Sequence, residues 1–383
     1  MTETFAIAAP RVFDGTLWHE RAAVIVDGDL VAGVTPQTDL HPGLRIERLA
    51  KGLLAPGFVD LQINGGGGVL FNDAPGIDAI KAISAAHLKR GTTSMLVTLI
   101  SDTGDKIDAA IAAAVEAQEA RVPGLLGLHL EGPHLGPTRP GAHDPSRIRP
   151  MGDADLRRLL AAKARLDVLM VTVAPEAITL DQIAALAKAG IVVSLGHSEA
   201  TFEAVRRATE AGARSVTHLF NAMNPFLHRA PGLIGAALEI GQLSASLIAD
   251  GVHVSPAALA IAIRAKRGPG KLFLVSDAMP TVASDKTEFN LAGRKARLED
   301  GRLRFADGTL VGAHLDMAGA ARFIHDHVGI ETGEALRMAT AYPAEVALCT
   351  GRVGTLVPGA RADLLRLGDD LTVEAVWSGG VRR

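Results

Sequence analysis

Strand-like and helix-like stretches alternate through the middle of this chain, from about residue 57 to residue 350, and this alternation narrows the possible folds more than any other feature. Eight short runs rich in β-branched residues and leucine are typical of buried strands: GFVDLQING, TTSMLVTLI, LLGLHLEG, LDVLMVTVAPE, GIVVSLGHS, ARSVTHLFNAM, LSASLIADGVHV and KLFLVSDAM. Alanine-rich stretches such as 76–91, 180–190 and 201–212 lie between them, and their apolar spacing and terminal glycines predict helices. Eight parallel strands joined by helices close most economically into a TIM barrel.

The two ends of the chain follow a different pattern. Short alternating segments separated by Gly, Pro and Asp fill the first 50 or so residues and return in the last 33 or so, which predicts a small β-sandwich built from residues 1–54 and 351–383. Residues 55–350 then form the barrel, and the 383-residue length suits a barrel of roughly 250 residues with a smaller companion. LAGRKARLEDGRLRFADGTLVG breaks the alternation and predicts a β-hairpin inserted at about 286–311.

Composition excludes several classes of partner. Lysine and arginine total 39 against 42 acidic residues, a net charge of −3, so there is no general basic field to attract nucleic acid or an anionic membrane. No apolar run approaches the roughly 20 residues that span a bilayer, and the N-terminus turns polar before a signal-peptide core develops. The single cysteine, Cys349, cannot form an internal disulfide. We therefore expect a cytoplasmic protein.

Three segments far apart in the chain carry side chains that bind metals: Glu131 in HLEGPH, His197 in SLGHSEA and His218 in THLFNAM. Each follows an apolar run, so each lies at the carboxyl end of a predicted strand, where barrel enzymes hold their chemistry. Two imidazoles and one carboxylate leave an open position on a zinc-like ion, which is typical of a catalytic site. Any one histidine alone could be a hydrogen-bonded core residue. As a set, the three residues predict a metal-dependent hydrolase that holds zinc, iron or cobalt.

A series of motifs connects these segments to a known family. PGFVDLQING, HLEGPH followed by GAHDP, GHSEAT, THLFNAMNP, PGLIG, ADGVH and VSDAM occur in this order between residues 56 and 279. The chain therefore resembles the N-acetylglucosamine-6-phosphate deacetylases of the amidohydrolase superfamily. The resemblance implies hydrolysis of N-acetylglucosamine 6-phosphate to glucosamine 6-phosphate and acetate, in amino-sugar catabolism or cell-wall recycling. It also implies one divalent ion, with zinc as the first candidate, bound by the three ligands above. It further implies a homodimer.

The resemblance assigns the proton transfers to Asp277, in LVSDAMP, which would take a proton from the attacking water and return it to the departing amine. On its own, this Ser-Asp pair could equally be a helix N-cap. Many superfamily members carry His-x-His after the first strand to hold a second metal, whereas Gln62 and Asn64 occupy those positions here, and amides are poor zinc ligands. We expect one tightly held ion, with Gln62 binding it weakly or through water, or only hydrogen-bonding. Asp60 is expected to support a ligand from behind.

The resemblance places the substrate-binding residues in loops after the strands: Ala142, His143, Asn221, Ala222, His228, Arg229, His253, His314, Leu315 and Asp316. His143 is also expected to be catalytic, because it would stabilise the developing oxyanion. Arg229 would bind the phosphate. His228 could reach the phosphate in its own subunit or in a neighbouring one.

The GAHLDM segment at residues 312–317 departs from the Gly-Ser-x-Leu-Thr-Met-like segment of the family. His314 and Asp316 stand where small or hydroxylic residues are usual. This departure keeps open an alternative substrate, such as N-acetylgalactosamine 6-phosphate or another N-acyl amino-sugar phosphate. A non-catalytic sugar-phosphate sensor on the same barrel is a third reading, and it is disfavoured because the three ligands and Asp277 are all present.

Overall fold

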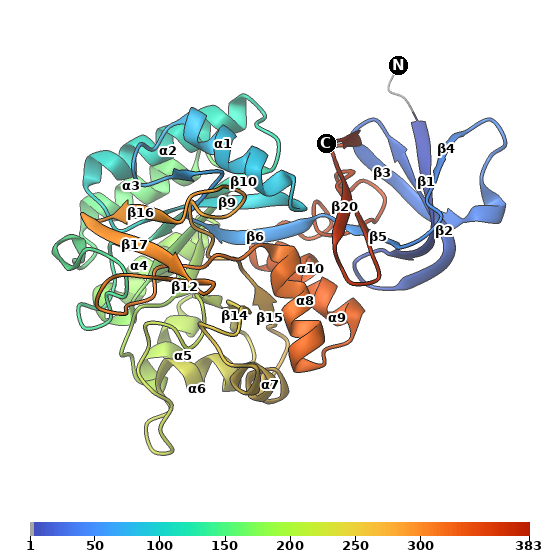
Figure 1. Ribbon diagram of the computed structural model, residues 1–383. Helices are drawn as coiled ribbons and strands as arrows, with labels where there is room; N and C mark the ends of the chain where they lie inside the picture. The colour runs from blue at the N-terminus through green and yellow to red at the C-terminus, as the bar shows by residue number, and fades with distance from the viewer. Residues whose placement is uncertain (1–3) are drawn as a thin grey trace.

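A computed structural model describes residues 4–383 and shows a barrel with a separate sheet beside it (Figure 1). All eight predicted barrel strands are present, in chain order around one parallel sheet: β6 (Phe58–Ile63), β9 (Thr92–Ile100), β10 (Leu125–Glu131), β11 (Val168–Val173), β12 (Val192–Leu195), β13 (Ser215–Val216), β14 (Ser244–Leu247) and β15 (Leu272–Leu274). A parallel bridge between Ile63 and Ala278 brings the first strand back to the end of the last. The predicted α/β barrel is confirmed.

Helices surround this barrel, and most fill the crossovers between strands: α1 (Ile77–Leu88), α2 (Gly104–Glu119), α3 (Asp153–Lys163), α4 (Leu180–Lys188), α5 (Phe202–Glu210), α6 (Gly232–Glu239), α7 (Pro256–Ala265), α8 (Met317–Val328), α9 (Thr332–Ala339) and α10 (Ala341–Val346). Thr103, Thr179 and Thr201 begin helices by accepting a hydrogen bond from a backbone N–H in the first turn. The expected terminal glycines Gly190 and Gly212 adopt positive φ just after α4 and α5. Within residues 4–383, no helix is both long and apolar enough to cross a bilayer.

Strands from both chain ends form a second sheet, in the order β21-β20-β19-β5-β1-β2-β3 with β4 also paired to β1. Their bounds are β1 (Thr4–Phe13), β2 (Trp18–Asp27), β3 (Leu30–Pro36), β4 (Arg45–Arg48), β5 (Leu53–Pro56), β19 (Leu364–Leu367), β20 (Val373–Ser378) and β21 (Val381–Arg382). Phe5, Val24, Leu54, Leu364 and Trp377 share one apolar cluster, so the sheet has its own core. The small β-rich unit built from both ends is confirmed. Strand β5 spans the expected 54/55 boundary, and the exact domain division stays a prediction.

A small antiparallel sheet lies between the last barrel strand and α8, where a hairpin was expected. It has three strands, β16 (Glu288–Leu291), β17 (Arg294–Glu299) and β18 (Arg302–Arg304). Leu291 and Leu303 of this sheet pack in one apolar cluster with Ile100 and Met279, which lie at the ends of barrel strands. The inserted sheet is therefore attached to the carboxyl end of the barrel. A shorter hairpin, β7 (Gly65–Gly66) and β8 (Val69–Leu70), follows the first barrel strand.

Candidate active site

A cavity of about 250 Å³ opens at the carboxyl ends of the barrel strands, the face on which barrel enzymes carry their chemistry. It is lined by Asn64, Ile100, Glu131, Gly141, Ala142, His143, His197, His218, Asn221, Ala222, Ile248, His253, Asp277, Met279, Leu291, Thr309, Leu310 and Gly312. Polar and titratable side chains from at least six strand ends therefore meet apolar ones in one pocket.

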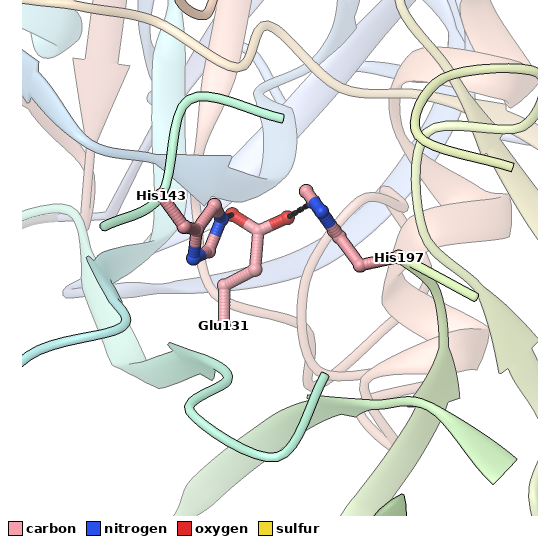
Figure 2. Close-up of side chains that lie close together, drawn as sticks. All are labelled: Glu131, His143 and His197. Carbon is pink, nitrogen blue, oxygen red and sulfur yellow. Dashed lines mark hydrogen bonds and ion pairs between the residues drawn. The ribbon is translucent and has the colours of Figure 1, made fainter. Parts of the chain in front are cut away.

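The three predicted metal ligands converge in this cavity. Glu131 Oε1 lies 2.9 Å from His218 Nε2 and 3.2 Å from His197 Nε2, and the two Nε2 atoms are 3.1 Å apart. Ligand atoms about 2.1 Å from a tetrahedral zinc ion are separated by roughly 3.4 Å. The three side chains are therefore spaced to share one ion. Figure 2 shows Glu131 between His197 and His143, whose Nε2 lies 3.8 Å from Glu131 Oε2.

Hydrogen bonds prepare this group for a cation. His197 Nδ1 lies 2.9 Å from the carbonyl oxygen of Arg139 and donates to it, which fixes the ring with Nε2 turned toward Glu131. Burial would raise the pKa of Glu131, but hydrogen bonds from His197 and His218 hold it well below its ordinary value. The carboxylate is thus charged and buried, and the Nε2 atoms of two imidazoles lie beside it. This donor chemistry fits a divalent metal.

The backbone is unusual at the residues that end these strands. His197, His218 and Asp277 have φ values of 48°, 32° and 50°, in the left-handed region that non-glycine residues rarely adopt. Such conformations cost free energy and cluster at functional sites, where the surrounding structure holds them in place. Here each sharp turn directs a side chain into the cavity at the point where its strand ends.

Asp277 lies beside the predicted ligands and is held by two amides. Asn64 Nδ2 donates to Asp277 Oδ1 at 2.6 Å, and Gln62 Nε2 donates both to the same oxygen and to Glu131 Oε2, each at 3.2 Å. Burial and the negative charge of Glu131 raise the pKa of Asp277 to about 6. The donor end of Gln62 faces the carboxylates, which supports the hydrogen-bonding reading of this residue. Direct ion binding by Gln62 stays a prediction.

Two serines and one aspartate support the site from behind. Ser101 Oγ lies 2.8 Å from His143 Nδ1, and Ser246 Oγ accepts the backbone N–H of His218 at 2.7 Å. Asp60 Oδ1 accepts the backbone N–H of Gln62 at 3.2 Å, which fits the supporting role expected for it. Our sequence reasoning missed both serines. Their positions in the sequence could have pointed to them, because Ser101 directly follows the strand TTSMLVTLI and Ser246 lies within the next-to-last barrel strand.

Five of the predicted substrate-binding residues line the cavity: Ala142, His143, Asn221, Ala222 and His253. Burial, together with the neighbouring His197, lowers the pKa of His143 to about 3, so this imidazole is neutral. His253 is oriented by Asp250, whose Oδ2 lies 2.7 Å from His253 Nδ1. The cavity therefore offers neutral and donor groups around a central carboxylate pair.

The other five predicted substrate residues make their contacts elsewhere in this structure. His228 and Arg229 are exposed on the loop 224–230. His314 Nδ1 lies 3.0 Å from Thr281 Oγ1, while Asp316 caps α8 by accepting the N–H of Gly319 at 2.7 Å. Leu315 is buried in the main core. Contact between these residues and a substrate stays a prediction.

Comparison with known proteins gives a consistent set of relatives. A model of the amidohydrolase family matches residues 53–382. An N-acetylgalactosamine-6-phosphate deacetylase of Shewanella sp. (strain ANA-3) is 41% identical over 87% of this chain and 84% of that protein. An N-acetylglucosamine-6-phosphate deacetylase of Haemophilus influenzae is 33% identical over 89% of each. The crystal structure of N-acetylglucosamine-6-phosphate deacetylase from Pasteurella multocida superposes with a TM-score of 0.95, at 31% identity and 99% coverage of both chains.

Proposed function

This chain belongs to the amidohydrolase family, whose members are metal-dependent, and on that premise we propose that it removes the acetyl group from a phosphorylated N-acetyl amino sugar. The products are the free amino-sugar phosphate and acetate, and N-acetylglucosamine 6-phosphate is the first candidate substrate. The observation that carries the proposal is the convergence of Glu131, His197 and His218 beside Asp277 in one cavity.

Glu131, His197 and His218 would hold one divalent ion, and we propose zinc because two imidazoles and one carboxylate suit it. When bound, such an ion polarises the amide carbonyl and makes a water molecule more acidic. Dialysed protein reconstituted with zinc should bind one equivalent per chain, measured by elemental analysis. Glu131→Gln should weaken zinc binding at least tenfold, whereas Glu176→Gln, outside the cavity, should not. More than one tightly bound equivalent would contradict the single-ion proposal.

The chain's own residues move the protons. Asn64 and Gln62 both donate to Oδ1 of Asp277, so Oδ2 is the oxygen left to accept a proton from the attacking water. Asp277 then returns this proton to the nitrogen of the departing amine, because an amine leaves far more readily when protonated. His143, neutral and 3.8 Å from Glu131, donates a hydrogen bond to the amide oxygen as negative charge develops there.

The phosphate would lie at the side of the cavity formed by Asn221, Ala222 and His253. Arg229 must reach it from the exposed loop, in its own subunit or in a second one. Phe226 and Leu227 on the same loop are 56% and 55% exposed. A second copy of the chain would cover these apolar side chains, so we propose a homodimer, which sedimentation velocity tests directly. We further propose a cytoplasmic location, on the composition and the single buried Cys349.

Replacing Arg229 tests its proposed role in phosphate binding. Arg229→Ala should raise KM for the phosphorylated sugar by roughly 10- to 100-fold, since a charge-assisted hydrogen bond is worth about 1.5–3 kcal/mol. KM for the unphosphorylated sugar should change little. Arg267→Ala, at an exposed arginine paired with Glu239, serves as the control. Equal effects of Arg229→Ala on both sugars would mean that Arg229 does not bind the phosphate.

The sugar configuration is the open part of the proposal. The 41% identity to an N-acetylgalactosamine-6-phosphate deacetylase specifically favours that sugar as the second candidate. The test is acetate release by zinc-reconstituted protein from both sugar phosphates and from unphosphorylated N-acetylglucosamine. Fast release from the glucosamine phosphate alone supports the first candidate, and preference for the galactosamine phosphate replaces it. No release from any of them, with metal bound, would favour the sensor.

A further inference from the structure

Ser101 contacts the ring of His143 on the side opposite to the metal ligands. The serine directly follows β9 and is 5% exposed, and its hydroxyl lies 2.8 Å from His143 Nδ1. Its backbone N–H also points at this nitrogen, at 3.3 Å. His143 is therefore held at Nδ1 by two groups of one residue.

These contacts determine where a neutral His143 carries its proton. A backbone N–H can only donate, so its contact with Nδ1 at 3.3 Å favours a lone pair on this nitrogen. A neutral imidazole has one proton for its two nitrogens, which places it on Nε2. The Ser101 hydroxyl can donate to the same lone pair. Its other acceptor, the carbonyl oxygen of Glu131, is 3.5 Å away and so forms a weaker bond.

The opposite edge of the ring faces the reaction centre. His143 Nε2 lies 3.8 Å from Glu131 Oε2, and the ring meets the edge of His197 with centroids 4.6 Å apart. A proton on Nε2 is directed into the cavity toward negative charge. If the proton were on Nδ1, this N–H would face the backbone N–H of Ser101. The lone pair of Nε2 would then face the Glu131 carboxylate, and this contact is repulsive.

A glycine leaves room for the hydroxyl of Ser101. A Cβ atom at Gly132 would lie 2.3 Å from Ser101 Oγ, and Gly132 has a φ of 82°. A glycine there lets the hydroxyl approach the strand end that carries Glu131. The serine thus lies between the end of β10 and the His143 ring, and it also lines the second cavity beside the site.

We propose that Ser101 is a positioning residue that keeps the proton of His143 on Nε2, so that His143 donates a hydrogen bond to the substrate amide oxygen. The proton assignment follows from the contacts alone, whereas its use in catalysis rests on the function proposed above. Ser101 itself does not touch the reacting atoms.

The first test is spectroscopic and uses the zinc-loaded protein without substrate. Nitrogen-15 NMR of histidine-labelled protein at neutral pH should show His143 with a protonated Nε2 and an unprotonated Nδ1, and the signals lost in His143→Asn assign them. A wild-type His143 with its proton on Nδ1 would overturn the proposal. This result does not depend on any turnover, so it stands apart from a failure of the proposed function.

The second test compares variants at Ser101. Ser101→Ala should lower kcat roughly tenfold, less than the 10²–10³-fold typical of losing an oxyanion donor outright, because the backbone N–H remains. KM should stay within about twofold, and both His143 tautomers should appear in the spectrum. Ser101→Thr, which keeps the hydroxyl, should recover most of kcat. Ser84→Ala, which removes another buried serine hydroxyl bonded to a carbonyl, is the matched control and should leave kcat unchanged. An unchanged kcat and a single tautomer in Ser101→Ala would refute the role.

Discussion

At the scale of single residues, the side-chain amides of Gln62 and Asn64 stabilise two buried carboxylates that repel each other. Glu131 and Asp277 are two buried carboxylates in one cavity, and each raises the cost of ionising the other. The side-chain amides of Asn64 and Gln62 donate to Asp277 Oδ1 and Glu131 Oε2, respectively. Amides add hydrogen bonds but no charge, so the site keeps one negatively charged pocket suited to one cation.

Asp277→Asn should lower kcat by about 10³-fold, because the amide cannot accept the proton of the attacking water. Zinc content and thermal unfolding should remain close to those of the wild type. Acetate release and elemental analysis on the same preparation measure both. Asp73→Asn, in a neighbouring cavity, controls for loss of an acidic group. A rate within tenfold of the wild type would rule out Asp277 as the general base.

Glu131, His197 and His218 were predictable because each follows a strand-like run, and parallel strands end on the same face of a barrel. The hydrogen-bond partners of Gln62, Asn64 and Ser101 were not predictable from the sequence. A hydrogen bond between Asn64 and Asp277 depends on how two segments more than 200 residues apart meet. No local sequence pattern indicates how close these two segments come in the folded protein.

At the scale of elements, the inserted sheet contributes a side chain to the wall between two neighbouring cavities. Leu291 of β16 and Ile100 of β9 line both the main cavity and a second cavity of about 300 Å³ beside it. These two apolar side chains separate the cavities. The inserted sheet therefore forms part of the wall between the two cavities.

Leu291→Ala should join the two cavities and admit longer N-acyl chains. We expect the ratio of kcat/KM for N-butanoyl to N-acetyl substrate to rise roughly tenfold, since the side chain that blocks the longer acyl chain is removed and forcing extra methylenes into a filled space costs about 1–3 kcal/mol. Leu298→Ala, in the same apolar cluster but outside the cavity lining, is the control. An unchanged ratio in Leu291→Ala would show that this wall does not restrict acyl size.

The start of α3 provides a pH-dependent contact far from the metal ligands. Hydrogen bonds from Arg149 lower the pKa of Asp155 to about 2, from 3.8 in an unfolded chain. A carboxylate with a lowered pKa adds stability that is present above pH 3.8 and is lost as the pH falls toward 2. Arg149 is half-exposed, so solvent screening reduces the contribution to about 1 kcal/mol. The difference in melting temperature between wild type and Asp155→Asn should therefore shrink from pH 7 to pH 3, and a constant difference would contradict this account.

The barrel strands were predictable as elements because continuous apolar runs bounded by turns are the pattern of strands buried on both faces. The first strand of the inserted sheet, β16, was not predictable. Glu288–Leu291 is short and half polar, and only its pairing with Arg294–Glu299 makes it a strand. Short edge strands of this kind are determined by their partners more than by their own residues.

At the scale of the whole molecule, Arg361 joins the sheet of the chain ends to the barrel. Its Nε donates to Asp363 at 2.6 Å, and its Nη2 donates to Ser94 Oγ at 3.2 Å and to the carbonyl of Thr93 at the start of β9. Asp363 is 2% exposed and also accepts the N–H of Gly379. This guanidinium thus adds polar contacts to a junction where Leu53 and Leu365 of the end-derived sheet already pack in the apolar core of the barrel.

Arg361→Ala should destabilise the protein by about 2–3 kcal/mol, because it leaves the buried Asp363 carboxylate without its cation. Chemical denaturation followed by tryptophan fluorescence reports the loss, since Trp18 and Trp377 both lie in the end-derived sheet. Arg267→Ala breaks an exposed ion pair and should cost less than about 1 kcal/mol. Equal losses in the two variants would mean that the junction is not stabilised by this pair.

The sheet built from both chain ends also imposes an order of events during synthesis. Strand β5 pairs with β1 on one side and with β19 on the other, and roughly 300 residues of barrel separate β5 from β19. At about 5–20 residues per second, the first strands wait tens of seconds on the ribosome with an open edge at β5. An open edge can pair with other nascent chains. This sheet can therefore be completed only after the barrel has been synthesised, and slow synthesis prolongs the time during which the edge of β5 is open.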